Sequence, residues 1–507
     1  MIERRQVVGA RHPARVTRGG FALHAGALLL ALASGWSASC AANPATGKSQ
    51  LNLYSEAQEI ELGRQAAAEV EQQMAFVDDP ALTGYVAELG HKLAAASERP
   101  GLPWSFRVVD DPVVNAFALP GGFIYVTRGL LGHVSTEAEL ASVIGHEIAH
   151  VTAQHGVNQM SKQQVAAGGL LLGMILSPEV AQAAGAAEAG LGLLFLKYGR
   201  DDERQADDLG LRYLAKTGYE AREMSSMFRV LQEVGEISGG GRVPNWLATH
   251  PDPGARRERS EQLIAERKYP PGQVGAEALL RRIDGLTFGP DPREGFFEGD
   301  TFFHPGLAFQ FQIPAGWRAV NEKARVVALH PDGVAEIELA LATGAKADEA
   351  ARTFLGREGI TTITSRKGKI HGLGAVLADF SVATQRAISG RAAFVEKDGK
   401  VFQLVGLVFS DRAVVARDAF ERTLGSFAPL KDRARLGAQP QRLRLVQLTA
   451  PTSFEQFRRQ YPAELEPRLY ELINRVDDPA IVLPAGTLLK RVEGRKAGSQ
   501  VAGPPLG

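Results

Sequence analysis

The sequence predicts an α+β protein: a mainly helical first part that contains a small sheet, a second part of mixed strands and helices, and a small C-terminal module. Three observations support this prediction. Apolar residues recur at helical spacing after Ser55. The pattern changes to short extended segments at Trp104. From Leu307 onward apolar and polar residues alternate, and Asp398-Gly399 between two apolar runs is typical of a β-hairpin turn.

Composition sets the outer limits. The chain has 507 residues, 45% of them hydrophobic and 22% charged, so it is long and apolar enough to bury more than one core. Lys plus Arg and Asp plus Glu both total 57, so the balanced charge predicts no nucleic-acid partner. We divide the chain into a signal peptide at 1–39, a first domain at 40–285, an α+β domain of unknown role at 295–430 and a module at 441–493.

The N-terminal segment has the order of a secretory signal. Basic residues are followed by an apolar run over 21–33, small residues at 37–39 and then Cys40, the one cysteine of the chain. The run is short for a membrane span. Cys40 resembles the lipid-modified cysteine of bacterial lipoproteins, although Ser37 stands where those signals usually carry Leu. We expect a periplasmic protein anchored to the outer membrane at Cys40. The alternative is an ordinary cleaved signal.

Helical signals dominate the first domain. Residues 41–50 are polar and small, which favours a tether. A helix begins at Ser55, because Gln58 completes a capping-box pattern, and a second covers about 81–96. Residues 164–197 are rich in Ala, Gly and Leu. We expect a helical hairpin there that lies over the polar motifs described next, and a membrane-touching surface is the alternative.

Two further helices carry the polar motifs. One begins at Thr136 and is expected to reach about His155, with Gly156 as its C-cap. The other covers about 202–216 and ends at Gly218. Each of these two helices contains a cluster of residue types that bind metal ions.

His146-Glu147-Ile148-Ala149-His150 matches the H-E-x-x-H pattern inside the first of these helices. Positions i and i+4 are about 40° apart around a helix, so His146 and His150 project side by side and can hold one tetrahedral Zn²⁺. Glu147 lies about 100° away, beside the metal rather than on it. A carboxylate in that position can act as general base for the attacking water.

The residues alone leave the third ligand open. The extended motif that would supply a His fails, because Ala153 and Gly156 occupy its Gly and His positions. We interpret His155 as a cation favoured by the dipole at the helix C-terminus, not as a ligand. Glu203 and Asp207 share a helix face, so Glu203 can bind zinc while Asp207 accepts the spare N–H of a ligating His. The alternative is a solvated acidic helix start.

The chain from about Asn43 to Leu263 resembles the HtpX/CaaX-prenyl-protease type of zinc metallopeptidases, metallopeptidase family 48, and within it the periplasmic and lipoprotein members such as BepA and LoiP. The resemblance implies a zincin fold of the gluzincin type, one Zn²⁺ per chain and Glu203 as third ligand. Gly199 stands where the family commonly has Ser. The matching motifs, in order, are Asn115-Ala116-Phe117-Ala118-Leu119-Pro120-Gly121-Gly122, His146–His150, Arg200-x-x-Glu203-x-x-Ala206-Asp207 and Thr249-His250-Pro251.

Further polar and extended segments are candidates for substrate contact. The strand over 123–127 is expected to offer free backbone groups to an extended substrate. Arg200 and His250 are further polar candidates near the metal. For His250 two roles stay open. It can swing onto the metal and close the site until a substrate competes, or it can donate a hydrogen bond to the developing oxyanion.

The C-terminal half shows no cluster of catalytic residue types. Residues 300–428, with Ile313-Pro314-Ala315-Gly316-Trp317, resemble a PsbP/Mog-one-like α+β domain, a likeness that implies no function. Residues 444–492 resemble a degenerate LysM module in which Ala450-Pro451 replaces the usual Gly-Asp. Peptidoglycan binding and a plain docking role both remain open for this module.

These patterns together favour an envelope metalloendopeptidase that cleaves unfolded or misassembled proteins, with Glu147 as base. Partners would be such substrates, and envelope assembly machinery or peptidoglycan through the C-terminal module. One rival is a chaperone or assembly factor with a mostly closed peptidase site. A second is a cell-wall protein whose C-terminal modules dominate. An intact Glu147 favours the enzyme, because a binding protein has no need of it.

Overall fold

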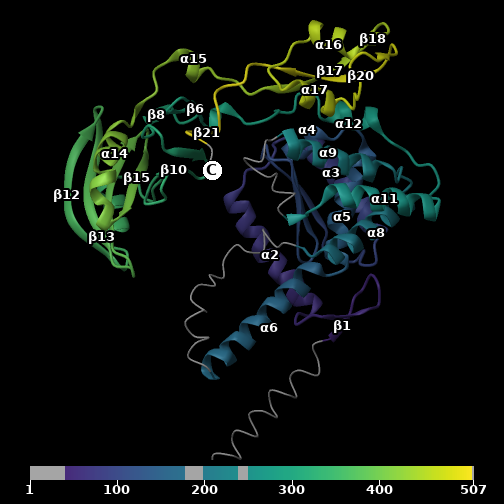
Figure 1. The fold of residues 1–507 in the computed structure, drawn as a ribbon, viewed down its shortest axis with the longest axis horizontal. Coiled ribbons are helices and arrows are strands. Elements are labelled where there is room, and N and C mark those ends of the chain that lie inside the picture. Colours follow the sequence, from purple (N-terminus) through teal and green to yellow (C-terminus); the bar gives the residue numbers. More distant parts are fainter. Residues whose placement is uncertain (1–39, 177–197, 238–248, 505–507) are drawn as a thin grey trace, which may run out of the picture.

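The computed structural model describes residues 40–176, 198–237 and 249–504. The expected signal peptide, most of the expected hairpin over 164–197 and the glycine-rich segment at 238–241 therefore lie outside the described residues. The described chain forms two lobes (Figure 1). The first lobe is mainly helical and holds the H-E-x-x-H helix. The second lobe is built on a large antiparallel sheet.

Helices surround a small sheet in the first lobe. The helix α2 (Glu56–Gln73) begins at the expected capping box of Ser55 and Gln58, and α3 (Pro80–Ala95) matches the second expected helix. A three-stranded sheet follows, in the order β3-β5-β4. The zinc-motif helix α5 (Glu137–Thr152) packs against α3, β4 and α8 (Arg200–Thr217). The strands are β3 (Ser105–Val109), β4 (Ala116–Leu119) and β5 (Phe123–Thr127).

The sheet order corrects one expectation. The strand β5 is central, because β3 pairs with it in parallel and β4 pairs with it antiparallel. The backbone of 123–127 is therefore not free for a substrate. The outer position next to β5 belongs to β4 instead. Thr127 donates its N–H to the carbonyl of Asn115, so by the antiparallel alternation the backbone groups of Ala116 and Ala118 point away from β5.

The motif helix ends earlier than expected. It stops at Thr152, Ala153 is its C-cap, and Gln154 adopts a positive φ of 59°. His155 then begins a new helix, α6 (His155–Leu176). His155 is thus no cation at a helix C-terminus. It lies at a helix N-terminus, and burial lowers its pKa, so the neutral ring is favoured.

Residues 41–50 are also more ordered than a tether. Strands β1 (Cys40–Ala42) and β2 (Ser49–Leu51) pair as a hairpin. Asn43, which follows β1 directly, is buried. Asn43 accepts the N–H groups of Ala45 and Thr46 through Oδ1, and this turn closes the hairpin. Asn43 closes the turn and also hydrogen-bonds to buried groups, which explains why this polar segment is folded.

The second lobe holds an eight-stranded sheet, in the order β12-β13-β14-β15-β11-β10-β9-β21, with α13 (Ala347–Leu355) and α14 (Ala413–Gly425) packed on it. The expected hairpin turn is present at Asp398-Gly399, both with positive φ. The strands are β9 (Arg318–Asn321), β10 (Arg325–Leu329), β11 (Ala335–Leu341), β12 (Ile360–Ile370), β13 (Leu373–Val382), β14 (Ile388–Lys397), β15 (Lys400–Phe409) and β21 (Val501–Ala502).

A smaller sheet in the order β16-β8-β7-β6 joins this lobe. Its core is aromatic, with Phe302, Phe309 and Phe427 fully buried. The last described strand, β21, pairs with β9, so the chain returns to the second lobe after the C-terminal module. The four strands are β6 (Phe296–Glu298), β7 (Thr301–His304), β8 (Phe309–Gln312) and β16 (Ala428–Pro429).

The C-terminal module packs on the first lobe beside α4 (Arg128–His133) and α9 (Glu223–Ile237) (Figure 1). Its buried residues Leu443, Phe457 and Ile473 belong to the same apolar core as the zinc-motif helix. The division of the chain into domains stays a prediction. The module consists of β17 (Arg442–Gln447), β18 (Thr452–Ser453), α16 (Phe454–Gln460), α17 (Pro467–Ile473), β19 (Val482–Leu483) and β20 (Leu488–Glu493).

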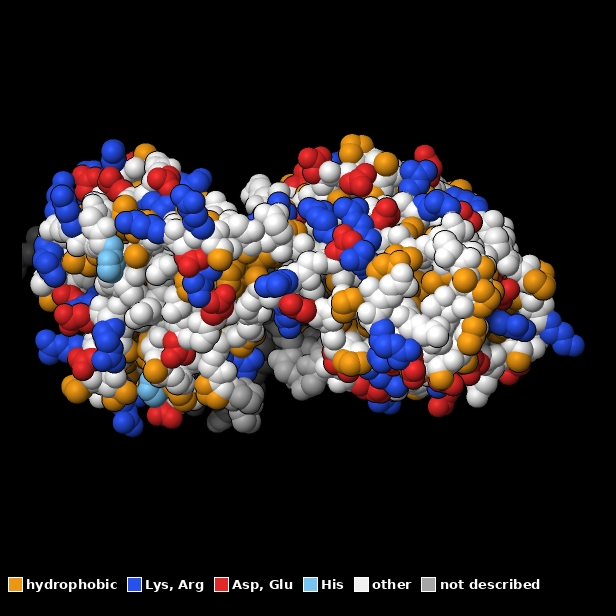
Figure 2. Space-filling model, turned by 90° about the horizontal axis from the view of Figure 1, so that it is seen from above, with side chains coloured by type: hydrophobic (Ala, Val, Ile, Leu, Met, Phe, Trp, Pro, Cys, Tyr) orange, Lys and Arg blue, Asp and Glu red, His pale blue; other side chains and the backbone are white. Residues whose placement is uncertain are grey.

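Polar contacts reinforce this docking. Lys490 is 1% exposed and donates to the carbonyls of Gly132 and Val134. Arg475 binds both carboxylate oxygens of Glu139, in the first turn of α5. On the face seen in Figure 2, Lys or Arg and Asp or Glu side chains are interspersed on both lobes. In the part of the chain that the structure describes, no helix has the length and apolarity to cross a membrane.

Candidate metal centre

Four buried side chains converge at the centre of the first lobe. The zinc-motif helix α5 contributes His146 and His150, α8 contributes Glu203, and the turn before α11 (Pro253–Arg267) contributes His250. Each offers one ligand atom, and these atoms lie within 4.8 Å of one another. In the described residues, this is the one group of His, Cys, Asp and Glu side chains arranged to hold a metal ion.

The distances fit a tetrahedral zinc ion. Bonds of about 2.0–2.1 Å in a tetrahedron place neighbouring ligand atoms roughly 3.4 Å apart. The Nε2 atoms of His146 and His150 are 3.0 Å apart. Glu203 oxygens lie 3.6 Å from Nε2 of His146 and 3.5 Å from Nε2 of His150. Imidazole and carboxylate donors at this spacing fit Zn²⁺.

The electrostatics keep the carboxylates ionised. Burial alone raises the pKa of Glu203, but His250 and Arg256 outweigh it and hold that pKa at about 2. Asp207 is 1% exposed, and the Arg256 guanidinium likewise holds its pKa far below the usual range against the effect of burial. Burial, then the neighbouring His146, lowers the pKa of His150 and favours the neutral ring.

The expected partner of a ligating imidazole is present. Asp207 Oδ1 lies 3.0 Å from Nδ1 of His146, which leaves Nε2 of that ring facing the other ligands. A carboxylate at this position fixes the tautomer and orientation of a metal-binding imidazole. Asp207 also accepts two hydrogen bonds from Arg256, at 3.0 and 2.6 Å, so its own position is fixed.

Glu147 and His250 face the same centre. Glu147 is fully buried, and neither of its carboxylate oxygens has a hydrogen-bond partner among the described residues. An unsatisfied buried carboxylate is costly in a folded protein and indicates a functional role. His250 lies 2.8 Å from Glu203 and 3.7 Å from Glu147. Burial lowers its pKa, but these two carboxylates outweigh burial and raise it.

Three neighbours of the ligands are missing from the sequence-based prediction or misread in it. Arg256 is buried, pairs with Asp207 and Glu203 and lies over the Phe228 ring. Tyr198 stacks on His150, with ring centroids 3.9 Å apart. His155 lies 3.0 Å from His150, yet outside the ligand group. The sequence offered one signal for two of them, which is closeness to a motif. Tyr198 directly precedes Gly199, and Arg256 follows His250 within a few residues.

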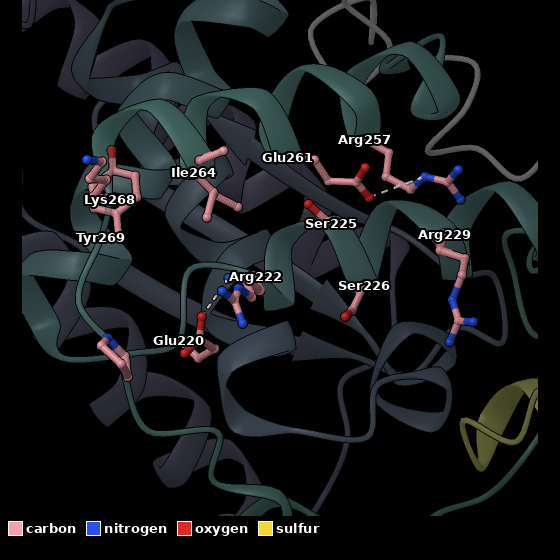
Figure 3. Close-up of a pocket in the computed structure, with 12 residues that line it drawn as sticks. Glu220, Arg222, Ser225, Ser226, Arg229, Arg257, Glu261, Ile264, Lys268 and Tyr269 are labelled. Atoms are coloured by element: carbon pink, nitrogen blue, oxygen red, sulfur yellow. Dashed lines mark hydrogen bonds and ion pairs between the residues drawn. The ribbon is translucent and has the colours of Figure 1, made fainter.

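Of two surface clefts, one is separate from the metal centre and one reaches it. The more spacious one, about 690 Å³, lies between α9 and α11 and holds none of the four ligands. Figure 3 shows Arg222, Arg229 and Arg257 along it. A smaller cleft of about 430 Å³ reaches Glu203 and Arg256, and the exposed Arg200 lines it. Of these two clefts, the smaller one is therefore the one that reaches the candidate metal centre.

Comparison with known proteins agrees with this geometry. A Vibrio cholerae protein with the provisional name beta-barrel assembly-enhancing protease is 37% identical over 203 residues, 38% of this chain and 41% of that protein. The beta-barrel assembly-enhancing protease of Escherichia coli K12 is 30% identical over 233 residues, 43% and 47% of the two chains. The mitochondrial metalloendopeptidase OMA1 of Arabidopsis thaliana is 34% identical over 198 residues, 37% and 38%. The chain thus spans less than half of each relative.

Among solved structures, cyanobacterial PsbP from Synechocystis matches 25% of this chain and 91% of its own, with 13% identity and a TM-score of 0.23. A likeness this weak carries no argument. Residues 80–263, by contrast, match the sequence model of Peptidase family M48 and contain His146, His150 and Glu203. The chain therefore carries a zinc metallopeptidase domain of Peptidase family M48.

Proposed function

We propose that the chain is a zinc-dependent metalloendopeptidase that hydrolyses peptide bonds in unfolded or misassembled proteins of the bacterial envelope. One observation carries the proposal. The carboxylate of Glu147 is fully buried, has no hydrogen-bond partner among the described residues and faces a group that fits zinc. A buried carboxylate without hydrogen bonds costs stability, so a chemical role explains it best.

The side chains would divide the work. A zinc ion at this site supplies Lewis acidity, which lowers the pKa of a water molecule and polarises the scissile carbonyl. Glu147 takes the proton of the attacking water and passes it to the leaving amine nitrogen. Asp207 holds His146 in the tautomer that binds through Nε2, and Arg256 fixes Asp207 and Glu203.

The substrate would bind as an added strand beside β4. Ala116 and Ala118 direct their backbone groups away from β5, so an extended peptide can pair with them. Main-chain pairing reads little sequence, which suits unfolded chains of many kinds. Asn115, just before β4, has a buried Oδ1 without a partner in the described part of the chain, and we assign it to a substrate N–H.

His250 would close the site at rest. It is 1% exposed and lies as near to Glu203 and His146 as a fourth ligand must, at 2.8 and 3.4 Å. An imidazole there occupies the open position that an attacking water needs. We favour this role over hydrogen bonding to the oxyanion because His250 stands among the ligand atoms.

Location and partners follow from the sequence signals. We propose export to the periplasm and anchoring to the outer membrane through Cys40, supported by the order of basic, apolar and small residues before it. The names of the bacterial relatives support a role in envelope assembly. Peptidoglycan contact through 441–493 is a further proposal.

The test is cleavage of an unfolded protein such as casein by the full chain. Zinc-loaded wild type should cleave it, and a chelator should stop the cleavage. Glu147→Gln removes the base but no ligand, so zinc content should stay at one per chain while cleavage falls by about 10²-fold or more. Undiminished cleavage by Glu147→Gln would overturn the proposal. Zinc binding with no cleavage by wild type would favour the chaperone alternative.

A further inference from the structure

A series of hydrogen-bonded side chains connects the proposed metal ligand His150 to the N-terminal hairpin β1–β2. His150 Nδ1 lies 3.0 Å from Nδ1 of His155, whose Nε2 lies 2.7 Å from Oε1 of Gln205. Asn43, in the hairpin β1–β2, donates to that same Oε1 at 3.2 Å. Three short contacts thus join residues far apart in the sequence.

Binding of a metal ion through Nε2 of His150 would fix the direction of these hydrogen bonds. His150 presents Nε2 to the other ligand atoms, so its Nδ1 must carry the hydrogen. His155 then accepts at Nδ1, and its own hydrogen lies on Nε2 and points to Gln205. The amide oxygen of Gln205 accepts this hydrogen and also the one from Asn43. Every donor in this assignment meets an acceptor, so the neutral chain is self-consistent.

Asn43 also joins the two helices that carry the ligands. Its Nδ2 lies 3.1 Å from the carbonyl oxygen of Ala153, the C-cap of α5, 3.2 Å from Oε1 of Gln205 in α8 and 3.0 Å from Oε1 of Gln50, and its two hydrogens are shared among these three acceptors. Gln205 is two residues from Glu203. Asn43 is 5% exposed, and its Oδ1 closes the turn of the hairpin. The side chain that shapes the hairpin therefore also ties together the ends of α5 and α8.

We infer that the hairpin β1–β2 is the outermost part of the metal centre, in which Asn43 and Gln205 are positioning residues that hold His155, and through it His150, in the geometry that binds zinc. This inference rests on the zinc site of the proposed function. Ligating imidazoles usually donate to a carboxylate, carbonyl or water, and such partners determine metal affinity. Here another imidazole, His155, takes that place for His150.

The inference gives the N-terminal end of the hairpin a second role. Asn43 is three residues from Cys40, where we propose the lipid anchor. The proposed anchor at Cys40 and the metal centre would then be connected by strand β1 and by the hydrogen-bonded side chains from Asn43 to His150. Displacement of the hairpin would remove the hydrogen bonds that position His150, although every metal-ligand residue would still be present.

The test measures zinc affinity of the full chain by competition with a chelator, with the visible spectrum of the Co²⁺ form as a second readout. Gln205→Met removes the acceptor and should weaken zinc binding by about 10–100-fold. Gln205→Glu keeps an acceptor for His155 and should restore it. Asn43→Ala should weaken binding by roughly 10-fold, the low end of that range, because it acts through Gln205. Both weakened variants should show an altered Co²⁺ spectrum.

The matched control is Asn52→Ala. Asn52 is 8% exposed and secures the same hairpin through Gln154 at 3.3 Å, outside the chain to His150. Its zinc affinity should equal that of wild type. Equal loss in Asn52→Ala and Asn43→Ala would overturn the inference, as would unchanged affinity in Gln205→Met. Zinc affinity is measured without proteolysis, so the two proposals can fail separately. If the variants show the expected zinc affinities but the wild-type protein cleaves no substrate, the proposed function is wrong and this inference stands.

Discussion

Replacement of Arg475 by Met tests how the C-terminal module holds the zinc-motif helix. Arg475 donates to the two oxygens of Glu139 at 2.7 and 2.6 Å and to the carbonyl of His133 at 3.0 Å. The Glu139 side chain is 1% exposed, and that of Arg475 is 18% exposed. Met has a similar volume to Arg but no charge. In the Arg475→Met variant the buried Glu139 carboxylate therefore loses both hydrogen bonds from Arg475 and keeps the one from the Ser135 N–H.

The Arg475→Met substitution should lower the free energy of unfolding substantially. Removal of one partner from a buried ion pair costs about 3–5 kcal/mol. The partial exposure of Arg475 and the bond from Ser135 favour the lower end, about 3 kcal/mol. For a lobe of this size that is a fall in Tm of roughly 6–12 °C. Arg459→Met is the control, because Arg459 is a 69% exposed residue of the same module. A Tm fall no larger than that of the control would refute the reasoning.

The pH dependence gives an independent check. Burial raises the pKa of Glu139, but Arg475, with smaller contributions from the Ser135 N–H and Lys490, holds it below the ordinary value of 4.5. A depressed pKa in the folded state adds stability that is present above 4.5 and is lost as pH falls through the folded pKa. Without Arg475, the Ser135 N–H and Lys490 still lower the pKa of Glu139 against burial, but with less effect. The stability difference between wild type and Arg475→Met should therefore shrink as pH falls below 4.5. A constant difference down to acid unfolding would contradict this assignment.

Four further predictions follow from single residues. Glu203→Ala removes one of three protein ligands, so bound zinc should drop sharply, and one full zinc per chain in elemental analysis would sink the ligand assignment. His250→Ala should raise basal cleavage of an unfolded substrate, whereas a loss of about 10²–10³-fold with zinc retained would show an oxyanion role instead. Gly63→Ala should lower Tm, because its Cβ would overlap a carbonyl oxygen of the facing turn, while Gly84→Ala, with open space around it, should gain about 0.5–1 kcal/mol; equal shifts would be the contrary result. Cys40→Ser should release the mature chain from membranes, and unchanged partitioning would favour the ordinary signal peptide.

Sequence patterns were sufficient to predict the parts of the site that depend on local geometry. His146 and His150 share a helix face because four residues make slightly more than one turn, and Glu203 and Asp207 do so for the same reason. Capping at Ser55 and the turn at Asp398-Gly399 are likewise local. Local rules failed at Gln154, where a positive φ starts a new helix that no residue type announces.

Packing between distant elements sets the remaining contacts of the site. The motif resemblance places His250 near the metal, whereas Arg256 reaches it because α11 packs beside α8 and α9, a contact that no local pattern contains. The order β3-β5-β4 depends on non-local pairing, so the sequence could not show that β4 is the outer strand. The same holds for Asn43 beside Gln205, and for Arg475 on Glu139, 336 positions apart. Helix periodicity is a property of neighbouring residues, whereas the supports of this metal centre are set by packing between elements far apart in the chain.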